Sequence, residues 1–263
     1  MPNTAQSADL PLISVIIPTW NRADYLREAI ASVFAQDYPR VELIVVNDGS
    51  TDHTQAMLAS YGPQLTVLHQ ENRGIGAARN AGVARAHGGF FAFLDDDDLW
   101  IPDKLSHQMR RLVEEPATDV VYGHMQQFAS PELAAEERAK FRTIDGQVVP
   151  SPLPTSMLIR RTAFERVGPF SETLRLGIEV DWYARLHEAG LTKATLDTVV
   201  YRRRLHPGNV NVTQAHEQRE RIQVLRQMLA RRRAAGRVEP SVGAKPSPHA
   251  PFSNHPSTPS PDA

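Results

Sequence analysis

Cysteine is absent from the 263-residue chain, and this absence excludes disulfides and thiolate metal sites. Neither sign of charge is in excess, and a formal net charge of -1 argues against a nucleic-acid partner. No apolar run approaches the roughly 20 residues of a membrane-spanning helix, and residues 1–12 lack the basic and apolar regions of a secretory signal. We therefore expect a cytoplasmic protein, with a hydrophobic content of 41% that suffices for a core.

Apolar runs and helical patterns alternate over the first half of the chain. The runs are continuous in Val, Ile, Leu and Phe, which is typical of strands buried on both faces of a parallel sheet; they lie at 12–18, 41–48, 65–70 and 90–95. Helical patterns at 23–36 and 72–89 separate them. This alternation predicts an α/β fold with a doubly wound, mostly parallel sheet and helices on both faces.

The second half is less regular, and its segments are assigned singly. We predict strands at 119–128 and 193–206, a helix at 178–190, a mobile loop at 129–155 and an arginine-rich helix at 214–235. The chain is then divided into an extension at 1–10, one domain at 11–213, the basic helix and a Pro/Ser-rich tail at 236–263 that we expect to be disordered.

Polar segments follow three of the predicted strands, where open α/β sheets bind their ligands. They read PTWNR (18–22), NDGSTD (47–52) and DDDD (95–98). Adjacent carboxylates raise one another's pKa unless a cation compensates them, and Mg²⁺ or Mn²⁺ can do so while bridging to phosphates. If the acidic run is extended, Asp95 and Asp97 point to one side and Asp96 and Asp98 to the other. A solvated acidic turn that caps the helix beginning near 102 is the alternative.

Two other motifs fail on inspection. A calcium loop starting at Asp95 would need Gly at its sixth position and Glu at its twelfth, where Trp100 and Ser106 stand. The segment from Gly74 to Arg79 imitates a dinucleotide fingerprint, but its sixth residue is not Gly and it follows the third strand instead of the first.

Four segments together, PTWNR, VNDGSTD, ENRGIGAARNAG and FLDDDDLWIPDKL, resemble the family 2 inverting glycosyltransferases with the GT-A fold. The resemblance is close over about 12–130 and looser to about 210. It implies a nucleotide-binding half at about 11–128 and an acceptor half at about 129–213. A nucleoside-diphosphate sugar, UDP-linked by this resemblance, would bind across the first strands with Mn²⁺ or Mg²⁺ on its diphosphate.

The resemblance places the nucleotide against Pro18, Thr19, Trp20, Asn21, Arg22, Asp48, Arg73, Arg79, Asp95 and Asp96. Trp20 would stack on the base, Asp48 would accept a hydrogen bond from a pyrimidine ring, and Asp96 would meet the ribose. Ordinary packing is the alternative for Trp20, helix capping for Asp48, and a surface salt bridge for both Arg73 and Arg79. Asp97 is the favoured metal ligand, with Asp95 and His206 as the other candidates.

The acceptor side of the resemblance rests on GIEVDWYARL, where Glu179 matches the general base and Asp181 is the second choice. Residues two apart on a helix do not share a face, so we expect only one of them to reach an acceptor; N-terminal helix stabilisation is the alternative for the other. The implied reaction is a single displacement on a sugar nucleotide by the hydroxyl of a glycan, lipid-linked or small-molecule acceptor.

Two other functions share these features. A nucleotidyltransferase would show a Gly-rich loop after the first strand, and PTWNRAD has no Gly. A non-catalytic sugar-nucleotide-binding protein would not need the acids at 179 and 181. The predicted helix at 214–235 carries Ile222, Leu225 and Leu229 on one stripe, so it either lies on an anionic membrane surface or packs on the domain.

Overall fold

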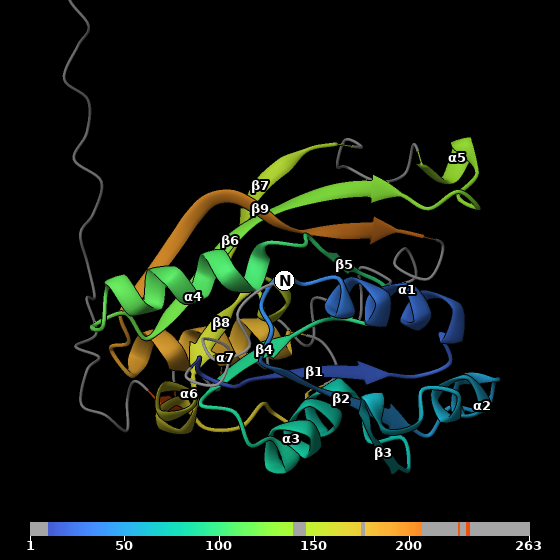
Figure 1. Ribbon diagram of the computed structural model, residues 1–263, viewed down its shortest axis with the longest axis horizontal. Coiled ribbons are helices and arrows are strands. Elements are labelled where there is room, and N and C mark those ends of the chain that lie inside the picture. Colours follow the sequence, from blue (N-terminus) through green and yellow to red (C-terminus); the bar gives the residue numbers. More distant parts are fainter. Residues whose placement is uncertain (1–9, 139–145, 175–176, 207–225, 227–229, 232–263) are drawn as a thin grey trace, which may run out of the picture.

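The computed structural model describes residues 10–138, 146–174, 177–206, 226 and 230–231 (Figure 1). The predicted tail at 236–263, most of the predicted helix at 214–235 and all but Leu10 of the predicted N-terminal extension lie outside these residues. In the described part of the chain, no helix combines the length and apolar character needed to cross a membrane.

The first four predicted strands are present, and they pair in parallel as expected. They are β1 (Ile13–Thr19), β2 (Val41–Asp48), β3 (Thr66–Gln70) and β4 (Phe90–Phe93). Their order across the sheet is β3-β2-β1-β4, with Ile13 of β1 opposite both Val41 and Phe90. Because all four run the same way, their carboxyl ends share one edge of the sheet.

The remaining described strands extend the same sheet beyond β4. They are β5 (Leu99–Trp100), β6 (Val120–Ala129), β7 (Val148–Ser151), β8 (Leu158–Arg160) and β9 (Lys193–Leu205). The order continues β4-β8-β6-β9-β5, and β7 pairs with β6 outside this order. β8 is antiparallel to both β4 and β6, whereas β6 and β9 are parallel. The second half of the sheet is therefore mixed, and in Figure 1 it rises over the parallel half.

The prediction of a loop throughout 129–155 is wrong in part. The segment includes the short helix α5 (Ala135–Arg138), the strand β7 and the 3-10 turn η2 (Pro154–Ser156). β7 is ordered because it pairs with β6, where Gly123 lies opposite Ser151 and Gln126 opposite Val148. Residues 139–145 lie outside the described part.

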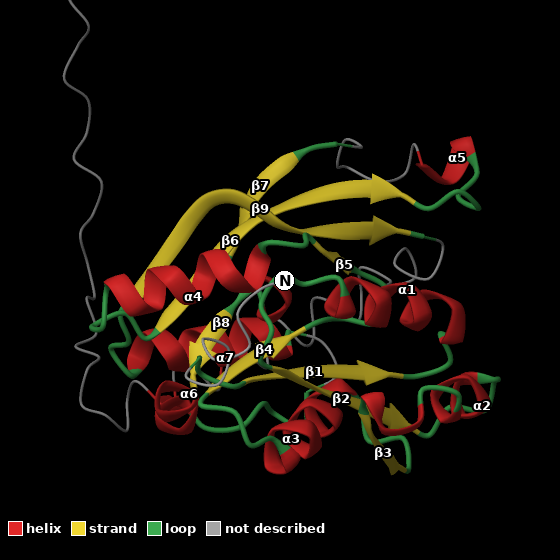
Figure 2. Cartoon of the chain, in the orientation of Figure 1, coloured by secondary structure: helices red, strands yellow, loops and turns green. Residues whose placement is uncertain are grey.

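Helices cover both faces of the sheet, as the strand patterns predict (Figure 2). On one face lie α1 (Ala23–Phe34), α2 (Thr54–Ala59) and α4 (Lys104–Glu114); on the other lie α3 (Ile75–Arg85), α6 (Arg161–Val167) and α7 (Ile178–Glu188). The 3-10 turn η1 (Gly62–Gln64) precedes β3. β1 serves both cores, since Val15 and Ile17 pack with α1 and Ile16 packs with α3. Each of these three side chains is fully buried, which stabilises the fold by about 1.5–3 kcal/mol per residue.

Candidate functional site

The four aspartates at 95–98 form a turn and not an extended strand, so the predicted two-sided alternation is wrong. The backbone N–H of Asp98 donates to the carbonyl of Asp95 at 3.1 Å. The turn directs the four carboxylates to partners from other parts of the chain, with Arg22 shared by Asp96 and Asp97. Their mutual repulsion is therefore offset by groups that the protein itself supplies.

Arg22, which precedes α1, holds the two middle aspartates. Its Nη1 lies 3.1 Å from Asp96 Oδ1 and also contacts Asp97 Oδ2. Asp96 accepts a further hydrogen bond of 2.7 Å from Thr19 Oγ1 at the end of β1. Burial raises the pKa of Asp96 above its ordinary value against the opposing charge of Arg22. Burial acts on Asp97 in the same direction, but hydrogen bonding to His206 and the charge of Arg22 outweigh it and leave the pKa of Asp97 lowered.

Asp97 and His206 form the pair that best fits a divalent metal. His206 Nε2 lies 3.0 Å from Asp97 Oδ2, and both side chains are buried. The end of β9 is fixed on the acidic turn because the Arg204 N–H donates to Asp98 Oδ1 at 2.9 Å and Arg204 Nε to the Asp97 carbonyl at 3.0 Å. A carboxylate oxygen suits Mg²⁺ or Mn²⁺, and substrate phosphates commonly complete such sites. No group of three or more metal-ligating side chains occurs within the described ranges.

Asp95, the alternative metal ligand, takes part in a different network. Its Oδ1 accepts from Arg79 Nη2 at 2.7 Å and its Oδ2 from Thr155 Oγ1 at 3.1 Å. The other terminal nitrogen of Arg79 donates to Glu179 Oε1 at 2.9 Å. Arg79 is fully buried, so the surface salt bridge considered for it is wrong. No sequence motif pointed to Thr155.

Asp48 at the end of β2 closes the loop that leads into α3. Its Oδ1 accepts from Gln70 Nε2 at 2.7 Å and the Arg73 N–H at 2.9 Å, and its Oδ2 accepts from the Gly74 N–H at 2.8 Å. The carboxylate thus faces the loop after β3 and not the start of α2, which is at odds with a capping role. The side chain of Arg73 is exposed and pairs with Glu172 at 2.6 Å.

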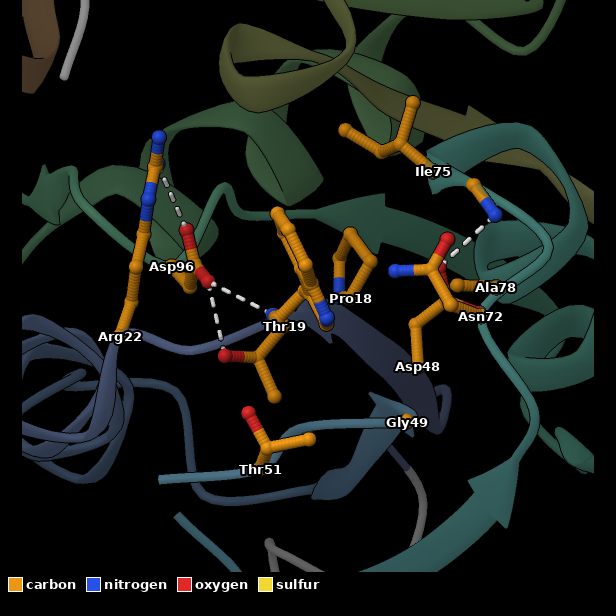
Figure 3. A pocket seen from close by; sticks show the side chains of 12 residues that line it. Pro18, Thr19, Arg22, Asp48, Gly49, Thr51, Asn72, Ile75, Ala78 and Asp96 are labelled. Atoms are coloured by element: carbon orange, nitrogen blue, oxygen red, sulfur yellow. Dashed lines mark hydrogen bonds and ion pairs between the residues drawn. The ribbon is translucent and has the colours of Figure 1, made fainter. Parts of the chain in front are cut away.

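A cavity of about 600 Å³ opens beside these acids at the carboxyl ends of the strands. It is lined by Pro18, Thr19, Trp20, Arg22, Asp48, Gly49, Thr51, Asn72, Gly74, Ile75, Ala78 and Asp96. Figure 3 shows Arg22 and Asp96 on one side and Asp48 and Asn72 on the other. Trp20 is 53% exposed, so it is not packed in the core.

Several of these lining residues were not singled out from the sequence. Asn72, Gly74 and Ile75 lie in the ENRGI stretch, and Gly49 and Thr51 in NDGST, so the motifs contained the signal although these residues were not among the predicted site residues. Asn21 was named but does not line the cavity. Its φ is 54°, and its Oδ1 accepts from the Thr51 N–H at 2.6 Å, which ties the loop after β1 to the loop after β2.

The two candidate bases on α7 point to different surroundings. Glu179 reaches Arg79 and keeps 30% of its side chain exposed. Asp181 is 3% exposed and is held by Arg185 at 3.0 Å and by Arg231 at 2.9 Å. Glu179 is therefore the more exposed of the two acids, whereas Asp181 is buried and paired with two arginines.

Residues 14–168 match the profile of the family described as Glycosyl transferase family 2. The chain belongs to this family. It is 34% identical over 193 residues to an uncharacterised glycosyltransferase of Rickettsia typhi, covering 68% of this chain and 59% of that protein. It is 42% identical over 108 residues to a candidate teichuronic acid biosynthesis glycosyltransferase, TuaG, of Bacillus subtilis, covering 40% and 43% of the two chains.

Solved structures of glycosyltransferases have a similar fold. The mannosyltransferase PcManGT from Pyrobaculum calidifontis, in complex with GDP-Man and Mn²⁺, aligns with a TM-score of 0.62 at 22% identity, covering 85% of this chain and 66% of that one. TarS of S. aureus in complex with UDP-GlcNAc aligns with a TM-score of 0.61 at 21% identity, covering 85% and 73%. This chain therefore has the GT-A type of α/β fold predicted for it, with a largely parallel, curled sheet.

Proposed function

We propose that this chain is an inverting, metal-dependent glycosyltransferase that moves a sugar from a nucleoside-diphosphate donor to an acceptor hydroxyl. The donor we favour is a UDP-sugar. The observation that carries the proposal is that Asp48 and Asp96 line one cavity at the carboxyl ends of the strands. Arg22 joins Asp96 to the Asp97–His206 pair, and Arg79 joins the neighbouring Asp95 to Glu179. Family membership and the sugar-nucleotide complexes of PcManGT and TarS support it.

The nucleoside would lie across the carboxyl ends of β1 and β2. A carboxylate offers about four acceptor positions, and Asp48 uses three of them on its own loop. The remaining position can accept the ring N–H of uracil. Trp20 at the exposed rim offers a face for stacking the base, and Asp96 beside Thr19 is placed for the ribose.

The residues present fit a divalent ion at Asp97 and His206. When bound there, such an ion supplies positive charge to the leaving diphosphate. Arg22 contacts the same Oδ2 atom of Asp97 as His206 does, so a bound ion would have to displace Arg22 from this oxygen.

Glu179 would take the proton from the acceptor hydroxyl. Burial raises the pKa of Glu179, but the charge of Arg79 and its hydrogen bond outweigh that effect, so the pKa lies below its ordinary value. The carboxylate is therefore ionised at neutral pH and can act as a general base. Because the hydroxyl attacks the anomeric carbon directly, the configuration at that carbon inverts. The acceptor would be a glycan, a lipid-linked sugar or a small molecule.

Turnover of a panel of sugar nucleotides with Mn²⁺ tests the proposal, with Asp97→Asn as the decisive variant. We expect the wild type to release a nucleoside diphosphate from one donor, and Asp97→Asn to lose at least about 100-fold of that rate, as expected when charge stabilisation of a leaving group is removed. Asp37→Asn, which changes an exposed carboxylate outside the site, should retain the wild-type rate. Undiminished turnover in Asp97→Asn would refute the metal assignment, and binding without turnover of any donor would favour a non-catalytic sugar-nucleotide-binding protein.

A further inference from the structure

Arg79 joins two acids that lie far apart in the sequence, Asp95 after β4 and Glu179 at the start of α7. Its guanidinium lies 2.7 Å from the first and 2.9 Å from the second, and the arginine side chain itself has no exposed surface. Each acid keeps about a third of its own side chain exposed, at 34% and 30%. The arginine is thus a buried link between two carboxylates that are both partly exposed.

The link is held rigidly by its surroundings. The Arg79 guanidinium lies over the ring of Phe170 at 5.3 Å from the centroid, and Asp95 is fixed on its far side by Thr155. Arg79 Nε is buried without a hydrogen-bond partner among the described residues. A buried donor without a partner costs free energy. Arg79 bears this cost at Nε while its two terminal nitrogens contact Asp95 and Glu179.

From this geometry we propose that Arg79 is a positioning residue that sets the place and the charge of the Glu179 carboxylate relative to the acidic turn. The inference rests on the proposed function, in which Glu179 is the base. The planar fork of an arginine can hold two carboxylates at fixed directions, whereas a lysine ammonium cannot reproduce that arrangement. Glu179 lies in the first turn of α7 after Gly177, whose φ is 72°, so the linkage to Arg79 fixes the helix start at the site.

Burial raises the pKa of Glu179, but the charge and the hydrogen bond of Arg79 and a backbone hydrogen bond outweigh it and leave the pKa lowered. Among the described residues, Arg79 is the charged group that lowers this pKa. Asp181 and Glu188 on the same helix are engaged by Arg231, and Asp181 is also engaged by Arg185. Removing the guanidinium fork should therefore displace the Glu179 carboxylate and raise its pKa together.

The test compares Arg79→Lys with wild type in steady-state turnover over a range of pH and in calorimetric binding of UDP. We expect kcat to fall at least about tenfold, because a misplaced catalytic group loses rate steeply with distance. The affinity for UDP should stay within about twofold, and the acidic limb of the kcat/KM profile should move to higher pH. A residue needed only for folding would not move that limb.

Arg161→Lys is the matched control. Arg161 also uses a fork, donating from Nε to the Gly88 carbonyl at 2.8 Å and from Nη2 to the Ala86 carbonyl at 2.9 Å, at the opposite end of β4. Its substitution should cost stability without moving the acidic limb. If Arg79→Lys does not fold, the double variant Arg79→Gln, Asp95→Asn removes the unpaired buried charge and should show the same displaced limb.

The outcomes separate this inference from the proposed function. A wild type without turnover would overturn the proposed function and the inference with it. Wild-type turnover together with an unchanged kcat and acidic limb in Arg79→Lys would overturn the positioning role alone. A loss of UDP affinity that parallels the loss of kcat would also overturn it, because Arg79 would then act on the nucleotide.

Discussion

Replacing Asp48 by Asn tests whether its carboxylate both stabilises the loop between β3 and α3 and recognises the base of the donor nucleotide. The Asp48 oxygens accept three hydrogen bonds, two on Oδ1 and one on Oδ2. An asparagine can keep the two on its carbonyl oxygen, but its amide group would then face the Gly74 N–H, and two donors would meet. Loss of one hydrogen bond to a charged group costs about 2 kcal/mol.

Thermal unfolding followed by circular dichroism measures this cost. In a domain of this size, 1 kcal/mol corresponds to about 2–4 °C, so Asp48→Asn should melt about 4–8 °C below the wild type. The exposed Asp37→Asn exchange, which also removes one negative charge, should melt within about 1 °C of it. A midpoint for Asp48→Asn that equals that of the control would show that the carboxylate does not hold the loop.

The same variant tests base recognition. The one acceptor position left on Asp48 suits uracil, which carries a ring N–H, and opposes cytosine, whose ring nitrogen at that position is an acceptor. We expect the wild type to bind UDP more tightly than CDP, and the ratio to fall at least about tenfold in Asp48→Asn, since buried acceptors discriminate strongly between a donor and its absence. A lowered melting temperature with an unchanged ratio of UDP to CDP affinity would show that Asp48 stabilises the loop but does not recognise the base.

Two further substitutions test the packing around the site and the pH dependence of stability. Gly76→Ala should destabilise the fold by about 1–3 kcal/mol, because a Cβ there would lie 2.1 Å from the Ser171 carbonyl oxygen. Gly89→Ala is the control, since a Cβ at Gly89 meets nothing within 4 Å. Equal urea midpoints for the two variants would contradict the close contact at Gly76. Glu42→Gln should destabilise at pH 7 by about 1–2 kcal/mol, because burial raises the pKa of Glu42 but hydrogen bonds from Ser14 and the backbone outweigh it and leave it lowered. A carboxyl group with a lowered pKa stabilises the fold above the unfolded value of 4.5 and loses this contribution as pH falls through the folded value. The urea midpoints of the two proteins should therefore approach each other as pH falls below 4.5, and a gap that stays as large as at pH 7 would contradict the linkage.

Much of the parallel half of the sheet could be predicted because its strands are continuous apolar runs, and the central ones, β1 and β2, are largely buried on both faces. The run at 12–18 supplies side chains to both cores, and such a run has few alternatives to a buried strand. The polar segments that follow the strands were placed at one edge by the same reasoning. The strands β5 and β8 were missed because two or three residues are too short for a periodic pattern.

The partners of the site residues could not be predicted, because they are set by long-range pairing. Arg79 and Glu179 are 100 residues apart, and Arg204 reaches the Asp97 carbonyl from 107 residues away. Neither contact has a local sequence signal. Asp181 shows the same limit: the resemblance made it a candidate base, and its pairing with Arg231, 50 residues further on, has no local sequence signal either.

The arrangement of the acidic turn also changes how its charge is understood. The crowding of four aspartates suggested that a divalent ion is needed to hold them together, yet the protein itself engages each of them. Asp95 contacts Arg79, Asp96 contacts Arg22, Asp97 contacts both Arg22 and His206, and Asp98 accepts from the Arg204 N–H. An ion at Asp97 would therefore enter a site whose geometry is already fixed, and would compete mainly with Arg22 for one oxygen atom. Such preorganisation reduces the reorganisation required during reaction. The arginines of the protein therefore stabilise the turn even without a bound metal.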